Sequence, residues 1–260
     1  MDVAAIEGSI GPRIIPVTPE GFPRNNLTTL FLFKETVSGA GFKDEVSGNF
    51  YPFSGTAAPQ AGGGVQLSGN SMIVGPEFNI QARWTIMIGL TQPAQGTGLP
   101  ARRTWASIGT WGLRGINVWI NPNSGDDVSV NALHPLYARN MVSGAEAANW
   151  PGIQRPWVAQ YGKPQTVVMR HHGGGNVSFQ QRKGNAVRQA SSVWDMDAIT
   201  GPTGVKSALQ ALNIGAIAGY DGGSTIYDCA AIHTIRDLTE AEIRKFTAAH
   251  EALAATRGRS

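Results

Sequence analysis

The segment from Leu209 to Gly258 constrains the fold of this chain most strongly. It reads as a strand, a glycine-rich turn, a second strand and one helix. The helix has a complete start signal, because Thr239 stands three residues before Glu242 in the pattern of a capping box. Gly258 supplies a stop, since glycine readily adopts the left-handed conformation that closes helices. A single helix after a long run of strands is typical of an all-β sandwich.

The rest of the helix pattern agrees with a helix at 239–257. Leu238 and Ile243 have the spacing of a hydrophobic staple. Arg257 would lie favourably at the negative end of the helix. One face at helical spacing is expected to be buried, and it carries Ile243, Phe246, His250 and Leu253.

Most of the preceding chain reads as strands. In 83–90, alternation places Trp84, Ile86, Ile88 and Leu90 on one face. Residues 65–74 read as two short strands around the turn pair Gly69-Asn70, and 211–218 with 225–235 as a final strand pair. The other strands are expected at 27–34, 104–110, 115–120, 128–132, 165–171, 176–182 and 186–190.

Composition indicates one domain with surface available for contacts. Of 260 residues, 42% are hydrophobic and only 15% are charged, well below the usual quarter. The net charge of +3 forms no basic stripe, so we expect no nucleic-acid partner. No apolar run approaches the ~20 residues of a membrane helix, so we expect no membrane partner. Cys229 is the only cysteine and is expected to be a core thiol.

Residues 1–26 are predicted to form an extended arm, and 27–260 the folded domain. The arm carries Pro12, Pro16, Pro19 and Pro23, and proline fixes φ and removes a backbone donor. It is either a solvated terminus or an anchor that docks on a neighbouring subunit. The first residues lack the basic and apolar regions of a secretory signal, so we expect synthesis in a cytoplasm.

Three segments, 62–90, 163–189 and 212–246, combine strands with glycine-rich turns in a fixed order. Together they resemble the laminin-G-like and concanavalin A-like lectin/glucanase family. The resemblance implies an all-β, two-sheet antiparallel jelly-roll sandwich of six or seven strands a sheet, with carbohydrate or protein binding. The arm and residues 134–162 are extra. Modules with such additions look like those of bacteriophage tail, baseplate and capsid-surface proteins.

Motifs for catalysis or metal binding are weak. Glycoside hydrolases need two facing carboxylates, and the nearest pattern is Asp195 with Asp197, which is typical of a loop. Serine-hydrolase elbows and zinc spacings are absent. A loop with Asp126, Asp127, Asn121 and Asn123 is either a calcium site or an ordinary turn. His171 and His172 should point to opposite faces and cannot share a metal. We therefore predict no catalytic residue, metal or cofactor, and no enzyme activity.

Aromatic residues give the best binding hypothesis. The insertion at 134–162 interleaves rings with amides and arginines, which suits a partly wet carbohydrate site. A core cap or a subunit interface would use the same residues. Trp84, Trp105 and Trp119 lie in strands and are expected in the core. The predicted glycan ligands are Tyr137, Arg139, Asn140, Trp150, Arg155 and Trp157.

The sequence thus predicts a non-catalytic virion structural protein of a bacteriophage. It would bind a bacterial surface glycan as part of a tail fibre or baseplate, or decorate the particle. Expected partners are other virion proteins, contacted through the arm, and copies of the same chain in a trimer. The alternatives are a glycoside hydrolase of the same fold and a free carbohydrate-binding lectin.

Overall fold

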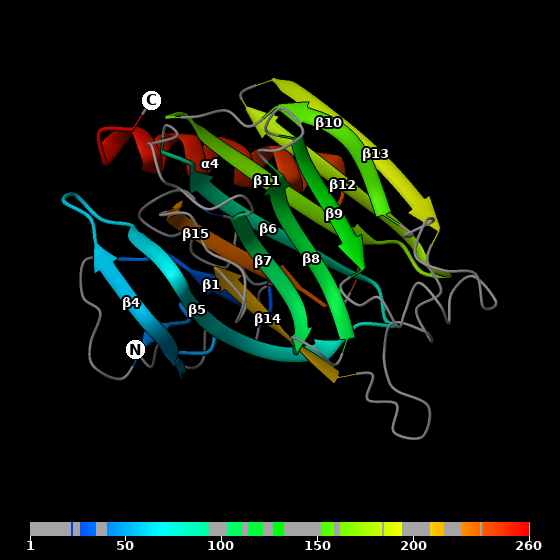
Figure 1. Ribbon diagram of the computed structural model, residues 1–260, viewed down its shortest axis with the longest axis horizontal. Helices are drawn as coiled ribbons and strands as arrows, with labels where there is room; N and C mark the ends of the chain where they lie inside the picture. Colours follow the sequence, from blue (N-terminus) through cyan, green and yellow to red (C-terminus); the bar gives the residue numbers. More distant parts are fainter. Residues whose placement is uncertain are drawn as a thin grey trace, which may run out of the picture.

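The computed structural model describes residues 22, 27–34, 41–93, 103–110, 114–121, 127–132, 152–158, 162–183, 185–193, 209–215, 225–234 and 236–259. Strands dominate, and one long helix accompanies them (Figure 1). The elements are β1 (Thr29–Phe31), β2 (Phe42–Lys43), β3 (Phe50–Tyr51), β4 (Phe53–Pro59), β5 (Val65–Asn79), β6 (Trp84–Thr91), β7 (Arg103–Thr110), β8 (Arg114–Asn121), β9 (Asp127–Ala132), β10 (Gly152–Val158), β11 (Pro164–His171), β12 (Asn176–Lys183), β13 (Ala186–Val193), β14 (Leu209–Gly215), β15 (Thr225–His233) and α4 (Glu240–Thr256).

The strands form two antiparallel layers, as predicted. Within the described residues, the back sheet has the order β1-β15-β6-β11-β12-β13 and the front sheet the order β4-β5-β14-β7-β8-β9-β10. The long strand β5 joins the two layers, because Val65–Leu67 pairs with β15 and Met72–Asn79 pairs with β14. Figure 1 shows the front strands β7, β8 and β9 crossing over the back strands β6, β11 and β15. The fold is therefore a two-sheet sandwich.

The main core lies between the two sheets. The predicted inner face of β6 is confirmed, since Trp84, Ile86, Ile88 and Leu90 are all buried in one cluster with side chains of the front sheet. Sheets that pack face to face in this way interdigitate the inward residues of both layers. The front sheet contributes Ala106, Ile108, Leu212 and Ile214.

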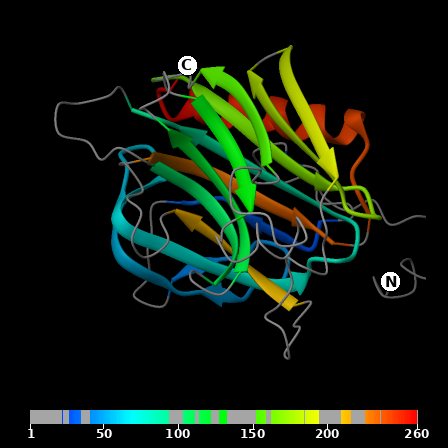
Figure 2. The same cartoon turned by 45° about the vertical axis from the view of Figure 1, so that its right-hand side comes forward.

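Helix α4 covers the outer face of the back sheet (Figures 1 and 2). The predicted capping box is present: the Thr239 hydroxyl accepts from the Glu242 amide, and the Glu242 carboxylate accepts from the Thr239 amide at 2.8 Å. Hydrogen bonds from Arg236, against the effect of partial burial, lower the pKa of Glu242 to about 2. Gly258 has φ +74° and closes the helix as expected. Arg257 differs from the expectation, because its guanidinium turns to Asp228 instead of the helix end.

Two strand predictions were wrong. Residues 65–74 form part of one continuous strand, β5, and the predicted turn pair Gly69-Asn70 lies in a bulge of that strand, where residues 69–71 oppose Gly55 alone. The strands β14 and β15 do not pair with each other. They belong to opposite layers, since each packs its apolar face on the shared core from a different side.

The end of the predicted arm packs on this chain's own helix. Phe22 is fully buried, and its ring meets the ring of Phe246 edge-on at a centroid distance of 5.1 Å. Leu27 and Ile243 belong to the same apolar cluster. Phe22 is the one described residue of 1–26, and it is anchored within the chain. No helix in the described part of the chain is long and apolar enough to cross a membrane.

Candidate functional site

A row of polar residues crosses four neighbouring strands of the front sheet. The register pairs Asn213 of β14 with Ser107 of β7. It then pairs Ser107 with Asn117 of β8, and Asn117 with Asn131 of β9. We call these four residues the polar row. The edge strand β10 continues it with Gly152.

The polar row belongs to the outer face of the front sheet. Successive residues of a strand lie on opposite faces. The residues next to the row, Ala106, Ile108 and Leu212, belong to the core between the sheets. Asn213 is 6% exposed, and the row runs from its strand β14 to the edge of the sheet. The row combines three amides and one hydroxyl, groups that can donate and accept hydrogen bonds.

An aromatic residue stands directly beside the polar row. Trp119 lies two residues along β8 from Asn117 and therefore on the same face. The register pairs Trp119 with Ser129, and Ser129 with Gln154. The register also pairs its neighbour Val118 with Ala106 of β7. Whether Trp119 belongs to the core, as the sequence predicts, stays a prediction.

Two of the predicted glycan ligands lie on the edge strand of this sheet. The register of β10 against β9 shifts after Gln154, and Arg155, Pro156 and Trp157 oppose a single residue of β9. Such bulges occur at sheet edges and re-aim side chains near functional sites. The backbone of Arg155 and Trp157 therefore lies in the irregular part of the edge strand β10. The other predicted ligands, Tyr137, Arg139, Asn140 and Trp150, lie outside the described residues.

The candidate acidic sites remain predictions. Asn121 and Asp127 are paired at the ends of β8 and β9. Their predicted partners in a calcium loop, Asn123 and Asp126, lie outside the described residues, as do Asp195 and Asp197. Among the side chains that the structure describes, no group of three or more His, Cys, Asp and Glu residues could hold a metal ion.

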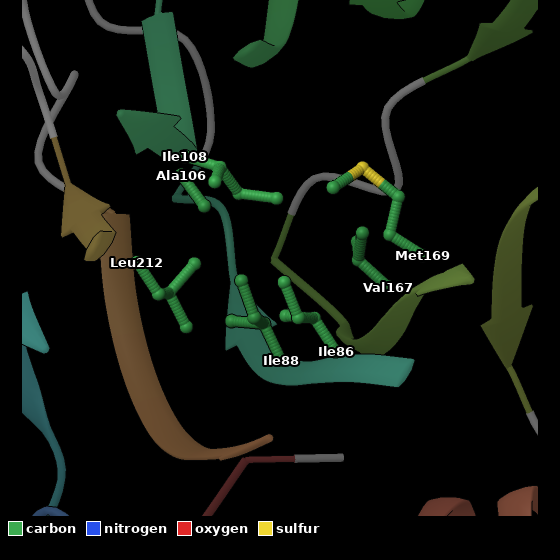
Figure 3. A pocket seen from close by; sticks show the side chains of 7 residues that line it. All are labelled: Ile86, Ile88, Ala106, Ile108, Val167, Met169 and Leu212. Atoms are coloured by element: carbon green, nitrogen blue, oxygen red, sulfur yellow. The ribbon is translucent and has the colours of Figure 1, made fainter. Parts of the chain in front are cut away.

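Between the described parts of the two sheets lies a cavity that is too small for a ligand. A cavity of about 10 Å³ lies between β6 and β11 on one side and β7 and β14 on the other (Figure 3). This volume is at the lower limit for one water molecule, and a water would need polar partners. All the lining residues are apolar: Ile86, Ile88, Ala106, Ile108, Val167, Met169 and Leu212.

A buried charged network holds α4 on the back sheet. The Asp228 carboxylate accepts hydrogen bonds from Arg257 at 3.0 Å and from Arg259, and its other oxygen lies 3.5 Å from His250 Nε2. His250 Nδ1 is 2.9 Å from the Thr166 hydroxyl. Burial raises the pKa of Asp228, but hydrogen bonds from His250 and Arg259 outweigh it and leave the pKa below its usual value. Asp228, His250 and Thr166 are fully buried, so we assign this network to stability.

The histidine and cysteine predictions are confirmed. The His171 ring packs near Trp84 and bonds the Ala82 carbonyl at 2.5 Å, while His172 points to the opposite side of the sheet. Cys229 is a buried free thiol, and burial raises its pKa well above the usual value.

No protein family and no curated protein sequence matches this chain. Among solved structures, the sialidase of Trypanosoma rangeli in complex with sialic acid is similar, with 15% identity and a TM-score of 0.54. The match covers 95% of this chain but 36% of the sialidase, so this chain spans about a third of that protein.

Two smaller proteins are matched over most of their length. Domain 4 of AbnA, a GH43 extracellular arabinanase from Geobacillus stearothermophilus solved with arabinotriose, has 14% identity and a TM-score of 0.58. That match covers 85% of this chain and 98% of the domain. Peanut lectin with a nine-residue peptide has 10% identity and a TM-score of 0.49, over 78% and 94% of the two chains. With the strand order above, the matches to the sialidase and to AbnA domain 4 show that the chain has a two-sheet antiparallel jelly-roll fold.

Proposed function

We propose that this chain is a lectin-like module that binds a bacterial surface glycan, without cleaving it, through the outer face of its front sheet. The observation that carries the proposal is the polar row beside Trp119. Planar amides can donate to and accept from sugar hydroxyls at once. An aromatic ring next to them offers a flat apolar surface to the face of a sugar ring. We expect Arg155 and Trp157, which lie in the irregular part of the edge strand β10, to contribute to the same site.

The structural neighbours support this choice. Arabinotriose is bound in the structure of AbnA domain 4, which this chain matches over 98% of the domain's length at a TM-score of 0.58. A fold of this kind hosts several functions, so the argument rests on the site.

The proposal is tested by exposing the labelled full chain to an array of bacterial surface polysaccharides. Binding without cleavage of the bound material is expected. Asn117→Ala and Trp119→Ala should each weaken that binding at least tenfold, because few central residues carry most of the affinity of a binding surface. Val187→Ala, an exposed apolar position on β13 of the back sheet, is the matched control and should bind like the parent.

Other outcomes of the array would favour other functions. No binding to any polysaccharide would contradict the adhesin and favour a role in building the particle. Cleavage products would favour the glycoside hydrolase, and variants at Asp195 and Asp197 would then be tested for loss of cleavage.

We further propose that the module is part of a bacteriophage particle and forms trimers through residues 1–20. The low charge and the proline-rich arm support an assembly role. Because Phe22 is buried against α4, the arm should be shortened before it. The full chain is expected to have a trimeric mass by light scattering, and a variant without residues 1–20 a monomeric mass at an unchanged unfolding temperature. If the full chain and the shortened variant have the same mass, assembly through the arm is contradicted. If an antibody against the chain does not bind purified bacteriophage particles, the location of the chain in the particle is contradicted.

A further inference from the structure

A second polar cluster lies on the helix side of the back sheet, away from the polar row. His172 follows β11, Ser178 lies in β12, and Asp237 precedes the cap of α4. His172 Nε2 is 2.7 Å from Ser178 Oγ, and His172 Nδ1 is 2.7 Å from Asp237 Oδ2. A proton on Nδ1 is donated to Asp237, which leaves Nε2 free to accept the proton of the serine hydroxyl. This is the order of contacts that a serine nucleophile, its general base and the orienting acid require.

The surroundings of the three residues supply a further group. Arg170 is the register partner of Ser178 on β11, so the two side chains share one face with Cβ atoms about 5 Å apart. Arg170 Nη1 donates to the Leu238 carbonyl at 3.2 Å. Its Nε is buried and has no hydrogen-bond partner among the described residues. A buried donor without a partner next to a nucleophile can stabilise a negative charge that develops on a substrate oxygen.

The position of Ser178 limits the substrate. Ser178 is 2% exposed, whereas the side chain of His172 is about one-third exposed at 32%. On the other side, Ser178 pairs with Ser191 of the edge strand β13, and Ser191 is exposed. The nucleophile is therefore one strand away from solvent, and we expect only a small substrate group, such as a short acyl group, to reach it.

We propose that Ser178, His172 and Asp237 form a hydrolytic triad that cleaves esters of short acyl groups. Ser178 Oγ bonds to the acyl carbon while His172 Nε2 takes the hydroxyl proton. The bond from the acyl carbon to the alcohol oxygen breaks, and His172 returns the proton to the leaving alcohol. Water then adds to the acyl-serine with His172 as base, which releases the carboxylic acid and restores Ser178. The Arg170 Nε–H holds the carbonyl oxygen in both steps.

The first test is labelling of the full chain with diisopropyl fluorophosphate, followed by mass spectrometry of the peptides. One phosphoryl group per chain is expected, on Ser178. Ser178→Ala should abolish the label, and His172→Gln should slow it at least a hundredfold, within the range that a general base contributes. Ser191→Ala, on the same face one strand away, should label like the parent. Absence of label, or a label on Ser191, would overturn the proposal.

A second test remains decisive if an alanine variant folds poorly. The native thiol, Cys229, is buried and gives little background with iodoacetamide. In a triad, a cysteine at position 178 is activated by His172 and should react faster than a cysteine at the more exposed position 191. The variants Ser178→Cys and Ser191→Cys are compared, with circular dichroism to establish folding. If Ser191→Cys reacts faster, the cluster is a structural latch between the β11–β12 hairpin and α4, and the proposal is overturned.

Discussion

Asp228→Ala is expected to lower the free energy of unfolding by about 3–5 kcal/mol, the usual cost of removing one partner from a buried ion pair. The carboxylate has no exposed surface, and it accepts from Arg257 and Arg259 while facing His250. Without this carboxylate, the buried Arg257 guanidinium would lose its ion pair and keep its hydrogen bonds to the backbone carbonyls of residue 228 and Phe33. Because α4 is held on the back sheet by this network, we expect the helix side to unfold first.

Urea unfolding followed by tryptophan fluorescence measures this change. Glu77→Ala removes an exposed carboxylate from β5 and is the control, expected within about 0.5 kcal/mol of the parent. If Asp228→Ala lowers the free energy of unfolding by less than about 1 kcal/mol, Arg257 and Arg259 become solvated at little cost in the variant. That result would contradict a stabilising role for the network.

The same network predicts a pH dependence. Because the folded-state pKa of Asp228 is depressed, the carboxylate stabilises the fold above the unfolded-state pKa of about 4. That contribution is lost as the pH falls through the lower folded-state value. The stability difference between the parent and Asp228→Ala should therefore be constant at pH 5–7 and shrink below about pH 4. A difference that stays constant down to pH 2 would contradict the depressed pKa.

Gly89→Ala should destabilise the protein by about 1–3 kcal/mol, the usual cost of forcing extra atoms into a packed interior. A Cβ at Gly89 would lie 2.5 Å from Cδ2 of His250 and 2.7 Å from Sγ of Cys229. Both neighbours are fully buried and cannot move into solvent. The absence of a side chain at Gly89 thus leaves the space that the His250 ring occupies against β6.

A double-variant cycle separates this clash from a general loss of packing. His250→Ala removes the ring that the new methyl group would meet, so Gly89→Ala should cost less in that background than in the parent. Residues in contact commonly show such coupling, whereas independent sites add. Additive costs, measured by urea unfolding, would contradict the predicted clash.

Local patterns predicted the elements whose signals lie within a few residues. The cap of α4 depends on Thr239 and Glu242, three positions apart, and was predicted together with its stop at Gly258. The inner face of β6 follows from alternation alone. The hairpin of β11 and β12 follows from the glycines at 173–175, all of which have positive φ.

The wrong or incomplete predictions concern segments whose conformation depends on pairing with distant strands. Gly69-Asn70 is a good turn pair, yet the strand continues through it as a bulge, because β5 has ladder partners before and after it. β4 and β15 pair with Val65–Leu67, and β4 and β14 pair with Met72 and Ile73. The insertion was expected to be a cap, an interface or a glycan site, and its last part proved to be the edge strand β10. Hydrogen bonding to β9 gave this segment its conformation, since a strand is stable only with a neighbour.

The sequence by itself determined the all-β class, the single closing helix and the apolar faces that form the core. Only the tertiary structure decided which polar residues meet. The polar row joins four strands through their register, and His172 meets Asp237 across 65 positions of the chain. The physical reason is that alternation and capping act between residues a few positions apart. Strand order and register depend on which faces bury one another across the whole domain.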